Sequence, residues 1–267
     1  MNLKSREGLL AGRVALVTGA VGAIGAAIAD RMAGQGADVV IADLNEAKAM
    51  ETAAEIAGRH SGRALGIGVD VTDPANLEAA ADRVEAELGV CDVIVANAGI
   101  LVAKPALEIE AREWNAVISV NLSGAFHTAT VFARRLERSG RDGSIIFSSS
   151  LFGIRGGRGN AAYSASKFGL IGLAQSMAAE LAPAGIRVNS VCPGQIETVM
   201  IEDLFRRRAE QNQTNPDHER SEFVQRIPMG RLGSADDVAD TFVYLASDLS
   251  GYVTGQSIVV DGGWQVG

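Results

Sequence analysis

The sequence of 267 residues has few of the residues that build disulfide frameworks and metal sites. It contains two cysteines, Cys91 and Cys192, and three histidines, His60, His127 and His218. Two cysteines are too few for a disulfide framework, and the histidines lack the spacing of metal ligands. We therefore expect no metal, and we interpret both residue types as packing or surface residues.

Basic residues are also in the minority. The chain has 24 lysines and arginines against 32 aspartates and glutamates, which gives a net charge of −8 at pH 7. Nucleic acids and anionic membranes favour a basic surface, so neither is expected as a partner. A small-molecule partner is favoured instead.

Long uncharged apolar runs are scarce. The first 32 residues begin as a secretory signal does, with basic residues before an apolar run, but Gly12, Gly19, Gly22 and Gly25 lie within that run. We expect no uncharged stretch elsewhere to reach the length of a membrane span. The sequence therefore predicts a cytoplasmic protein.

Apolar residues make up 47% of the chain, which is enough to bury a large core. Short runs rich in β-branched residues alternate with alanine-rich segments of helical period, as in strand–helix units around a parallel sheet. Seven buried strands are predicted, at residues 13–18, 38–42, 64–69, 93–97, 144–148, 187–191 and 257–260. No repeat or linker divides the chain. We predict a single α/β domain over residues 1–267, a doubly wound, seven-stranded parallel sheet of the Rossmann type with helices on both faces.

A glycine-rich turn, TGAVGAIGAAIA, follows the first strand and runs into a helix. Such glycines let the backbone approach a pyrophosphate, and the helix N-terminus offers free N–H groups to it. On its own, the pattern also fits a tight strand-to-helix turn. The next strand ends at Asp43, 24 positions after Gly19, where a carboxylate can accept hydrogen bonds from a ribose diol. The two features together predict a dinucleotide site.

Over essentially its whole length the sequence resembles the single-domain short-chain dehydrogenases/reductases. The glycine turn is similar to the family's Thr-Gly-x-x-x-Gly-x-Gly, with Ala23 at the second glycine, and residues 231–264 resemble its terminal block. A family element that lines the nucleotide cleft resembles Asn97-Ala98-Gly99. The family's adenine-contacting pair resembles Asp70-Val71, and the family segment that meets the nicotinamide carboxamide resembles residues 193–198. The resemblance implies these cofactor-binding residues: Gly19, Val21, Gly22, Ala23, Ile24, Gly25, Asp43, Asp70, Val71, Asn97, Ala98, Gly99, Tyr163, Lys167, Pro193, Gly194, Ile196 and Thr198.

Tyr163 and Lys167 stand four residues apart in NAAYSASKFGL, so they share one face of a predicted helix. A cation about 4 Å from a phenol contributes about 4 kcal/mol at an effective dielectric of about 20, enough to lower its pKa from about 10 to about 7. We therefore predict that Lys167 lowers the pKa of Tyr163 and makes it a general acid/base.

Ser150 lies thirteen residues before Tyr163, just past the fifth predicted strand. A lone serine at this place is usually a turn or cap residue, and Ser148 and Ser149 are adjacent alternatives. The family spacing selects Ser150. By resemblance, Asn121, Ser150, Tyr163 and Lys167 form the catalytic set of a hydride-transfer reaction: Ser150 holds the substrate oxygen, Lys167 also binds the nicotinamide ribose, and Asn121 shapes the local helix and a water chain.

The cofactor is predicted to be NAD. A carboxylate at Asp43 repels the 2′-phosphate of NADP, and neither AVGAI nor Leu44 and Asn45 supply a lysine or arginine to neutralise it. We expect at least a hundredfold preference for NAD.

The substrate is expected to be a polyol, a sugar or another small hydroxy compound. We expect Ser150, Phe152, Asn160 and Tyr163 to bind it. A charged excursion at about residues 198–226 is also expected to bind the substrate, since long excursions are often functional. Arg206 to Arg208 in this excursion could attract a phosphate or an acyl-carrier thioester, but a basic run in an acidic protein is more often solvated helix surface, and we interpret them so. Further candidate pocket walls are Leu151, Ile154, Val199, Met200, Ile201, Leu204 and Phe205.

Three alternatives stay open: a 3-oxoacyl-thioester reductase, a non-catalytic dinucleotide-binding regulator, and a methyltransferase on a similar sheet. The set of Ser150, Tyr163 and Lys167 argues against the last two, and Asp43 argues against the first because such reductases commonly resemble NADP users. The resemblance also implies a homotetramer formed through helices around residues 110–138 and 163–181.

Overall fold

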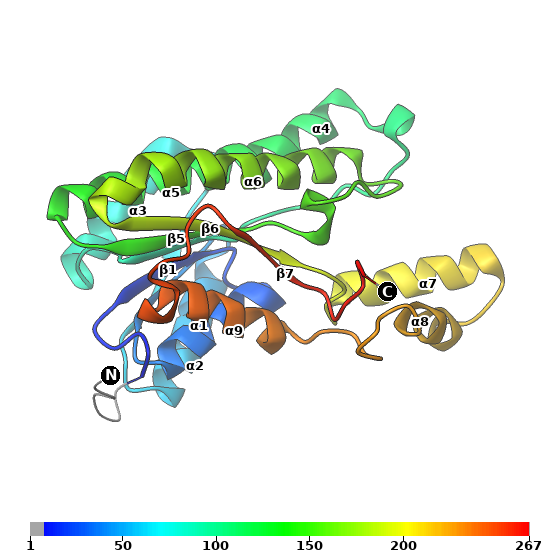
Figure 1. The fold of residues 1–267 in the computed structure, drawn as a ribbon, viewed down its shortest axis with the longest axis horizontal. Coiled ribbons are helices and arrows are strands. Elements are labelled where there is room, and N and C mark those ends of the chain that lie inside the picture. The colour runs from blue at the N-terminus through cyan, green and yellow to red at the C-terminus, as the bar shows by residue number, and fades with distance from the viewer. Residues whose placement is uncertain (1–7, 267) are drawn as a thin grey trace.

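A computed structural model describes residues 8–266, apart from the side chains of Val199, Met200, Arg207 and Gln211. Its centre is a parallel sheet of seven strands in the order β3-β2-β1-β4-β5-β6-β7 (Figure 1). The strands are β1 (Val14–Thr18), β2 (Asp38–Asp43), β3 (Ala64–Gly68), β4 (Val93–Ala96), β5 (Gly143–Ser148), β6 (Ile186–Pro193) and β7 (Ser257–Val260). Each lies where the sequence predicts a strand, with ends that differ by at most two residues. The predicted fold class is confirmed.

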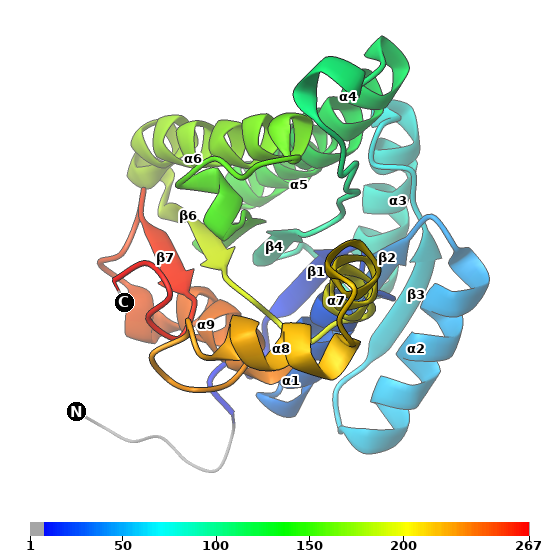
Figure 2. The ribbon, with the colours of Figure 1, turned by 90° about the vertical axis from the view of Figure 1, so that its right-hand side faces the viewer.

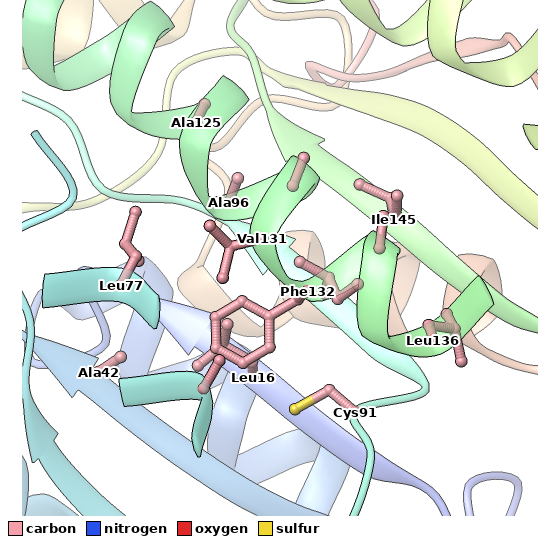
Figure 3. Packing of buried hydrophobic residues seen from close by; sticks show 14 of the residues in the cluster. Leu16, Ala42, Leu77, Cys91, Ala96, Ala125, Val131, Phe132, Leu136 and Ile145 are labelled. Carbon is pink, nitrogen blue, oxygen red and sulfur yellow. The ribbon is translucent and has the colours of Figure 1, made fainter. Parts of the chain in front are cut away.

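Helices cover both faces of the sheet, as Figure 1 shows. On one face lie α1 (Ala23–Gly34), α2 (Glu46–Arg59) and α9 (Ala235–Ala246), and on the other α3 (Pro74–Glu87), α5 (Gly124–Ser139) and α6 (Ala161–Leu181). The shorter α4 (Ala111–Ile118) precedes α5. Side chains alternate along each buried strand, so each face has its own apolar core. In Figure 3, Phe132 and Leu136 of α5 pack with Ile145 of β5, Leu16 of β1 and Leu77 of α3 in one of these cores.

Local sequence determines where several helices begin. Asp73 accepts a hydrogen bond from Ala75 N–H at 2.9 Å and is followed by Pro74, so α3 has both a capping carboxylate and a proline at its first position. Ser234 and Asp237 form a reciprocal capping box at the start of α9.

The helical stretch Ala111–Ser139 corrects one expectation. Within the described residues it is the one helix long and apolar enough, by length and composition alone, to cross a membrane. The expectation that no such stretch exists past the N-terminal region is therefore wrong. Half of its most apolar window is buried inside the protein, where α5 packs on the sheet. A core helix has the same composition, so the stretch is weak evidence for a membrane.

The excursion after β6 is helical. It forms α7 (Val199–Asn212) and α8 (Pro216–Val224), which extend past the carboxyl ends of the strands (Figure 1). Figure 2 looks onto this end of the molecule and shows both helices in front of the sheet. They pack around a small separate core. Its buried members are Leu151, Ile201, Phe205, Phe223, Ile227, Leu232 and Trp264.

Candidate active site

A cavity of about 1530 Å³ lies at the carboxyl ends of the strands. Its walls come from the glycine turn after β1, the end of β2, and the loops after β4, β5 and β6. The start of α6, parts of α7 and α8 and the chain near the C-terminus complete it. Open α/β sheets bind ligands at this edge, where the strand order reverses, so the cavity is the candidate functional site.

The glycine turn forms one wall because two of its glycines cannot carry a side chain. Gly19 has a φ of +64°, and a Cβ there would lie 2.8 Å from Cα of Ala98. A Cβ on Gly25 would lie 2.3 Å from the carbonyl oxygen of Gly19. Asn97 donates to the carbonyl oxygens of Thr18 and Gly19 and ties the turn to the end of β4.

The N-terminus of α1 therefore opens into the cavity. Gly22 is its N-cap residue, and no side chain among the described residues caps it. Gly22, Ala23 and Ile24 all line the cavity, so the alanine at the family's second glycine position is accommodated. First-turn N–H groups without a capping side chain suit a phosphate group.

Asp43 lies beside this turn at the end of β2. One carboxylate oxygen accepts a hydrogen bond from Asn45 N–H at 3.1 Å, and the other accepts one from Val21 N–H at 3.4 Å. These two contacts hold the carboxylate at the cavity wall. The position suits recognition of a ribose diol.

Most of the cofactor-binding residues expected from the sequence line the cavity, and three do not. Asp70 accepts hydrogen bonds from the hydroxyl and N–H of Thr72, which lower the pKa of its carboxyl. Val71 is buried against Gly124, and Ala98 is packed against Gly19. The expected residues that do line the cavity are Gly19, Val21, Gly22, Ala23, Ile24, Gly25, Asp43, Asn97, Gly99, Tyr163, Lys167, Pro193, Gly194, Ile196 and Thr198.

The three serines after β5 have different surroundings. Ser148 uses its carbonyl oxygen to accept a hydrogen bond from Lys167, and the hydroxyl of Ser149 donates to the carbonyl oxygen of Lys167 at 2.9 Å. The oxygen of the Ser150 hydroxyl accepts a hydrogen bond from Phe152 N–H at 3.1 Å. Ser150 is thus a helix cap, as a lone serine often is, and its hydroxyl also forms a hydrogen bond with the Tyr163 phenol.

Tyr163 and Lys167 share one face of α6, as their spacing predicts. The Nζ atom of Lys167 lies 5.4 Å from the centre of the Tyr163 ring and donates to the Ser148 carbonyl at 2.6 Å. The lysine is buried, and that burial lowers its pKa to about 8.

The predicted lowering of the Tyr163 pKa is wrong for this structure. Burial raises the pKa of the phenol, and a hydrogen bond with Ser150 offsets part of the effect. A lowered pKa requires the ammonium to lie about 4 Å from the phenol oxygen and the site to be well solvated. Here Lys167 lies against the ring and donates to Ser148, so desolvation dominates.

Asn121 is fully buried and does not line the cavity. It lies in a π-helical turn, Ser119–Ser123, between α4 and α5. Its amide accepts from Ile100 N–H at 2.8 Å and donates to the carbonyl of Ile100 at 2.9 Å and the hydroxyl of Ser166 at 3.1 Å. Ser166 in turn donates to the carbonyl of Tyr163. Asn121 therefore fixes the loop after β4 and the first turn of α6 relative to each other.

The four expected substrate-binding residues all line the cavity. Phe152 packs edge-on against Tyr163, with ring centres 6.4 Å apart. Asn160 belongs to a loop that pairs with the loop after β4 through a parallel bridge to Lys104.

The other candidate walls divide into two groups. Ile201 and Leu204 line the cavity. Leu151 and Phe205 lie in the small core beneath α7 and α8, and Ile154 is exposed. None of these three lines the cavity, so the prediction that they form its walls is wrong. The side chains of Val199 and Met200 lie outside the described part of the structure.

Arg206 to Arg208 are not uniform surface residues. Arg206 is exposed and pairs with Asp203, as expected of a solvated residue, whereas Arg208 lines the cavity. The side chain of Arg207 is not described. The expectation is therefore wrong for Arg208.

Sequence reasoning missed several lining residues. Trp264 comes from the far end of the chain, and Arg155, Arg158 and Arg226 come from loop or helix-end positions without a recognisable motif. Only the long excursion after β6 indicated that distant residues would complete the site.

The family model described as enoyl-(acyl carrier protein) reductase matches residues 19–265. The 3-oxoacyl-[acyl-carrier-protein] reductase FabG of Escherichia coli is 38% identical over 94% of this chain and 97% of its own. The L-2,3-butanediol dehydrogenase of Corynebacterium glutamicum is also 38% identical, over 94% and 98%.

A solved structure of a Beutenbergia cavernae protein, assigned as an NAD(P) dependent gluconate 5-dehydrogenase and carrying NADP at low occupancy, is 36% identical. It superposes with a TM-score of 0.87 over 97% of this chain and 98% of that one.

Proposed function

The chain belongs to the short-chain dehydrogenase/reductase family, and from that premise we propose that it interconverts a secondary alcohol and its ketone with NAD as cofactor. Family members are oxidoreductases that act on CH–OH groups with a nicotinamide dinucleotide. The observation that carries the proposal is the meeting of Ser150, Tyr163 and Lys167 in the cavity that the glycine turn also lines.

The residues present fit a dinucleotide. Gly19 and Gly25 leave no room for a side chain, so a pyrophosphate can approach the turn and the open end of α1. The carboxylate of Asp43 is placed to accept hydrogen bonds from a ribose diol, which supports NAD over NADP. When bound, the nicotinamide ring accepts or supplies the hydride.

Tyr163 transfers the proton in this proposal. In oxidation, the C–H hydrogen leaves the alcohol as hydride, and the phenolate of Tyr163 takes the hydroxyl proton. In reduction, the phenol returns a proton to the oxygen as hydride reaches the carbonyl carbon. The raised pKa keeps the phenol protonated at pH 7, the form needed for reduction, so oxidation first requires the phenol to lose its proton.

Ser150 and Lys167 support that transfer. The Ser150 hydroxyl accepts from Phe152 N–H and lies beside the Tyr163 phenol, so a substrate oxygen bound between the two can accept its proton. Lys167 donates one proton to the Ser148 carbonyl and has two more N–H groups for ribose hydroxyls. Asn121 positions the first turn of α6 through Ser166.

For the substrate we propose a polyol, a sugar or another small hydroxy compound. The similarity to the C. glutamicum diol dehydrogenase supports this class. A 3-oxoacyl thioester is the second candidate, favoured by the similarity to the E. coli reductase. Asp43 argues against a 3-oxoacyl thioester as substrate, because reductases of that class commonly resemble NADP users and the carboxylate repels a 2′-phosphate. A regulator without catalysis has no use for the complete Ser150, Tyr163 and Lys167 set.

We also propose a cytoplasmic homotetramer built through the helices around residues 110–138 and 163–181. Trp114, Phe126 and Phe168 on these helices are large apolar residues that are exposed in the single chain, which supports burial against further copies. Half of the apolar window of residues 111–139 is already buried inside the chain, which supports a soluble protein.

Ser150 and its neighbour provide a sharp test. NADH absorbance is followed with diols, sugars, hydroxy acids and acyl thioesters, in both directions. With the best substrate, Ser150→Ala is expected to lose at least about tenfold in kcat/KM, because the substrate oxygen loses its donor. Ser149→Ala is the matched control; it should retain kcat/KM, because its hydroxyl bonds the Lys167 carbonyl. The reverse result assigns the role to Ser149 and contradicts the proposal.

A further inference from the structure

We infer that the substrate carries an anionic group, a carboxylate or a phosphate, which Arg208 and Arg226 hold at the α7–α8 end of the cavity. The inference rests on the proposed function and adds the charge class of its substrate. It comes from the charge of the cavity wall and from the unusual placement of these two side chains.

The cavity wall is strongly cationic although the chain is acidic. Six lysines and arginines line it, whereas Asp43 is the one acidic residue among the described lining residues. Asp43 lies beside the glycine turn, at the dinucleotide end. The whole chain has a net charge of −8, so this concentration of positive charge is local. Clefts of one sign concentrate ligands of the opposite sign.

Two of these cations already have partners. Lys104 forms an ion pair with Glu113, and Lys167 donates to the Ser148 carbonyl. Of the four arginines, Arg155, Arg158 and Arg226 are exposed and Arg208 is half-buried. Arg208 and Arg226 are distinguished because each lies over an aromatic ring.

Arg208 and Arg226 lie on the same aromatic pair. The guanidinium of Arg208 is 5.4 Å from the ring centre of Phe223, and that of Arg226 is 4.7 Å from the ring centre of Trp264. The two rings are 4.8 Å apart. Phe223 and Trp264 are buried in the small core, so they form a fixed support for both side chains.

A guanidinium that lies over a ring directs its N–H donors outward in its own plane, where they fit a carboxylate or phosphate bidentately. Among the described side chains neither Arg208 nor Arg226 forms an ion pair. Neighbouring arginines of α7 and α8 do: Arg206 pairs with Asp203, and Arg220 with Glu197 and Glu202.

The nearby carboxylate of Glu219 has one oxygen that is already engaged. The charge of Arg208 contributes to the lowered pKa of Glu219, but the same oxygen of Glu219 accepts hydrogen bonds from Thr214 at 2.6 Å and Asn212 at 3.0 Å. Among the described side chains no ion pair joins Glu219 to Arg208, so the donors of the arginine remain available to a ligand.

The test compares alcohols that differ in one charged group. Lactate is paired with 1,2-propanediol, 3-hydroxybutyrate with 1,3-butanediol, and gluconate with sorbitol. Sorbitol 6-phosphate and 3-hydroxybutyryl-CoA are added, so that a carboxylate is distinguished from a phosphate or thioester. With NAD, the anionic member of the best pair is expected to have at least about thirtyfold higher kcat/KM, as two charge-assisted contacts allow.

Variants then assign the effect to the two arginines. The double variant Arg208→Gln/Arg226→Gln is expected to lose at least about thirtyfold in kcat/KM for the anionic member, mostly through KM. Its kcat/KM for the neutral member should change less than about threefold, which also shows that the variant is folded. Arg206→Gln, two residues away on α7 and paired with Asp203, is the control and should match the wild type.

Three results would overturn the inference. The first is equal kcat/KM of the wild type for neutral and anionic members, and the second is an equal loss of kcat/KM on both members in the double variant. The third is a loss of NADH affinity in the double variant, which would assign the arginines to the cofactor phosphates. Turnover of no alcohol or thioester would contradict the proposed function instead. Quenching of NADH fluorescence by pyruvate and acetoacetate then tests the anion site without turnover: binding that the double variant loses supports it, and no binding to wild type overturns it.

Discussion

Replacing Asp43 by serine is expected to weaken the choice of NAD over NADP. The carboxylate is held at the cavity by Val21 and Asn45 N–H groups, and the two residues that follow it, Leu44 and Asn45, carry no charge. Asp43 forms no ion pair within the described part of the chain. A 2′-phosphate placed on the adenosine ribose would therefore meet an uncompensated carboxylate.

The size of the effect follows from Coulomb's law. Two unit charges about 5 Å apart repel by about 3 kcal/mol at an effective dielectric of about 20. Asp43 is half-buried, so salt and water screen part of this, while the second phosphate charge adds to it. A hundredfold preference corresponds to about 2.7 kcal/mol, and we expect at least that for NAD in kcat/KM.

The assay measures initial rates with NAD and NADP at saturating alcohol. Asp43→Ser is expected to reduce the preference to about tenfold or less, and Asp43→Ser with Leu44→Arg to reduce it further, because a cation then faces the phosphate. Glu46→Ser is the matched control: it removes a nearby carboxylate that pairs with Arg83 and does not line the cavity. Equal use of NADP and NAD by the wild type would refute the reasoning.

Two further predictions concern stability. Gly25→Ala should lower the free energy of unfolding by at least about 2 kcal/mol and abolish NADH binding, because its Cβ would lie 2.3 Å from a carbonyl oxygen. Gly22→Ala is the control, because its Cβ would lie 3.6 Å from the nearest atom. Its free energy of unfolding, measured by urea denaturation, should differ from that of the wild type by less than about 1 kcal/mol. In the absence of cofactor, the lowered pKa of Lys167, about 8, means that the unfolded chain binds more protons between pH 8 and 10.5. Relative to Lys167→Met, the wild type should therefore gain about 3 kcal/mol over that pH range, and parallel stability curves would contradict the assignment.

Much of the fold could be predicted because the strands are buried on both faces. Residues 39–42 are apolar throughout, and the strand that starts at residue 186 contains Ile186, Val188 and Val191. Such runs alternate with helical segments, and this alternation fixes a parallel topology. The predicted strand at residues 187–191 ends two residues before β6 does, because Cys192 and Pro193 are not typical strand residues, yet both pair with β7.

The site could be predicted where spacing along one element determines proximity. Tyr163 and Lys167 meet because they share a helix face, and Gly19 and Asp43 meet because neighbouring strands end at one edge. The pKa of Tyr163 could not be predicted, since it depends on burial and on the direction of the Lys167 ammonium.

The cationic wall could not be predicted either. Arg208 lines the cavity while Arg206 on the same helix is solvated, and only the packing of α7 and α8 determines that difference. Arg226 and Trp264 are far apart in the sequence and meet through the small core. Nothing in the local sequence indicates such a contact.

The most direct test of the central claim is the turnover of Tyr163→Phe with the best alcohol, measured together with NADH binding by fluorescence. The variant keeps the ring that packs on Phe152 and Lys167 but lacks the proton-transferring hydroxyl. We predict that kcat falls at least about a hundredfold while NADH affinity changes less than about threefold. Near-normal turnover in this variant would contradict the proton-transfer role of Tyr163 and, with it, the proposed mechanism.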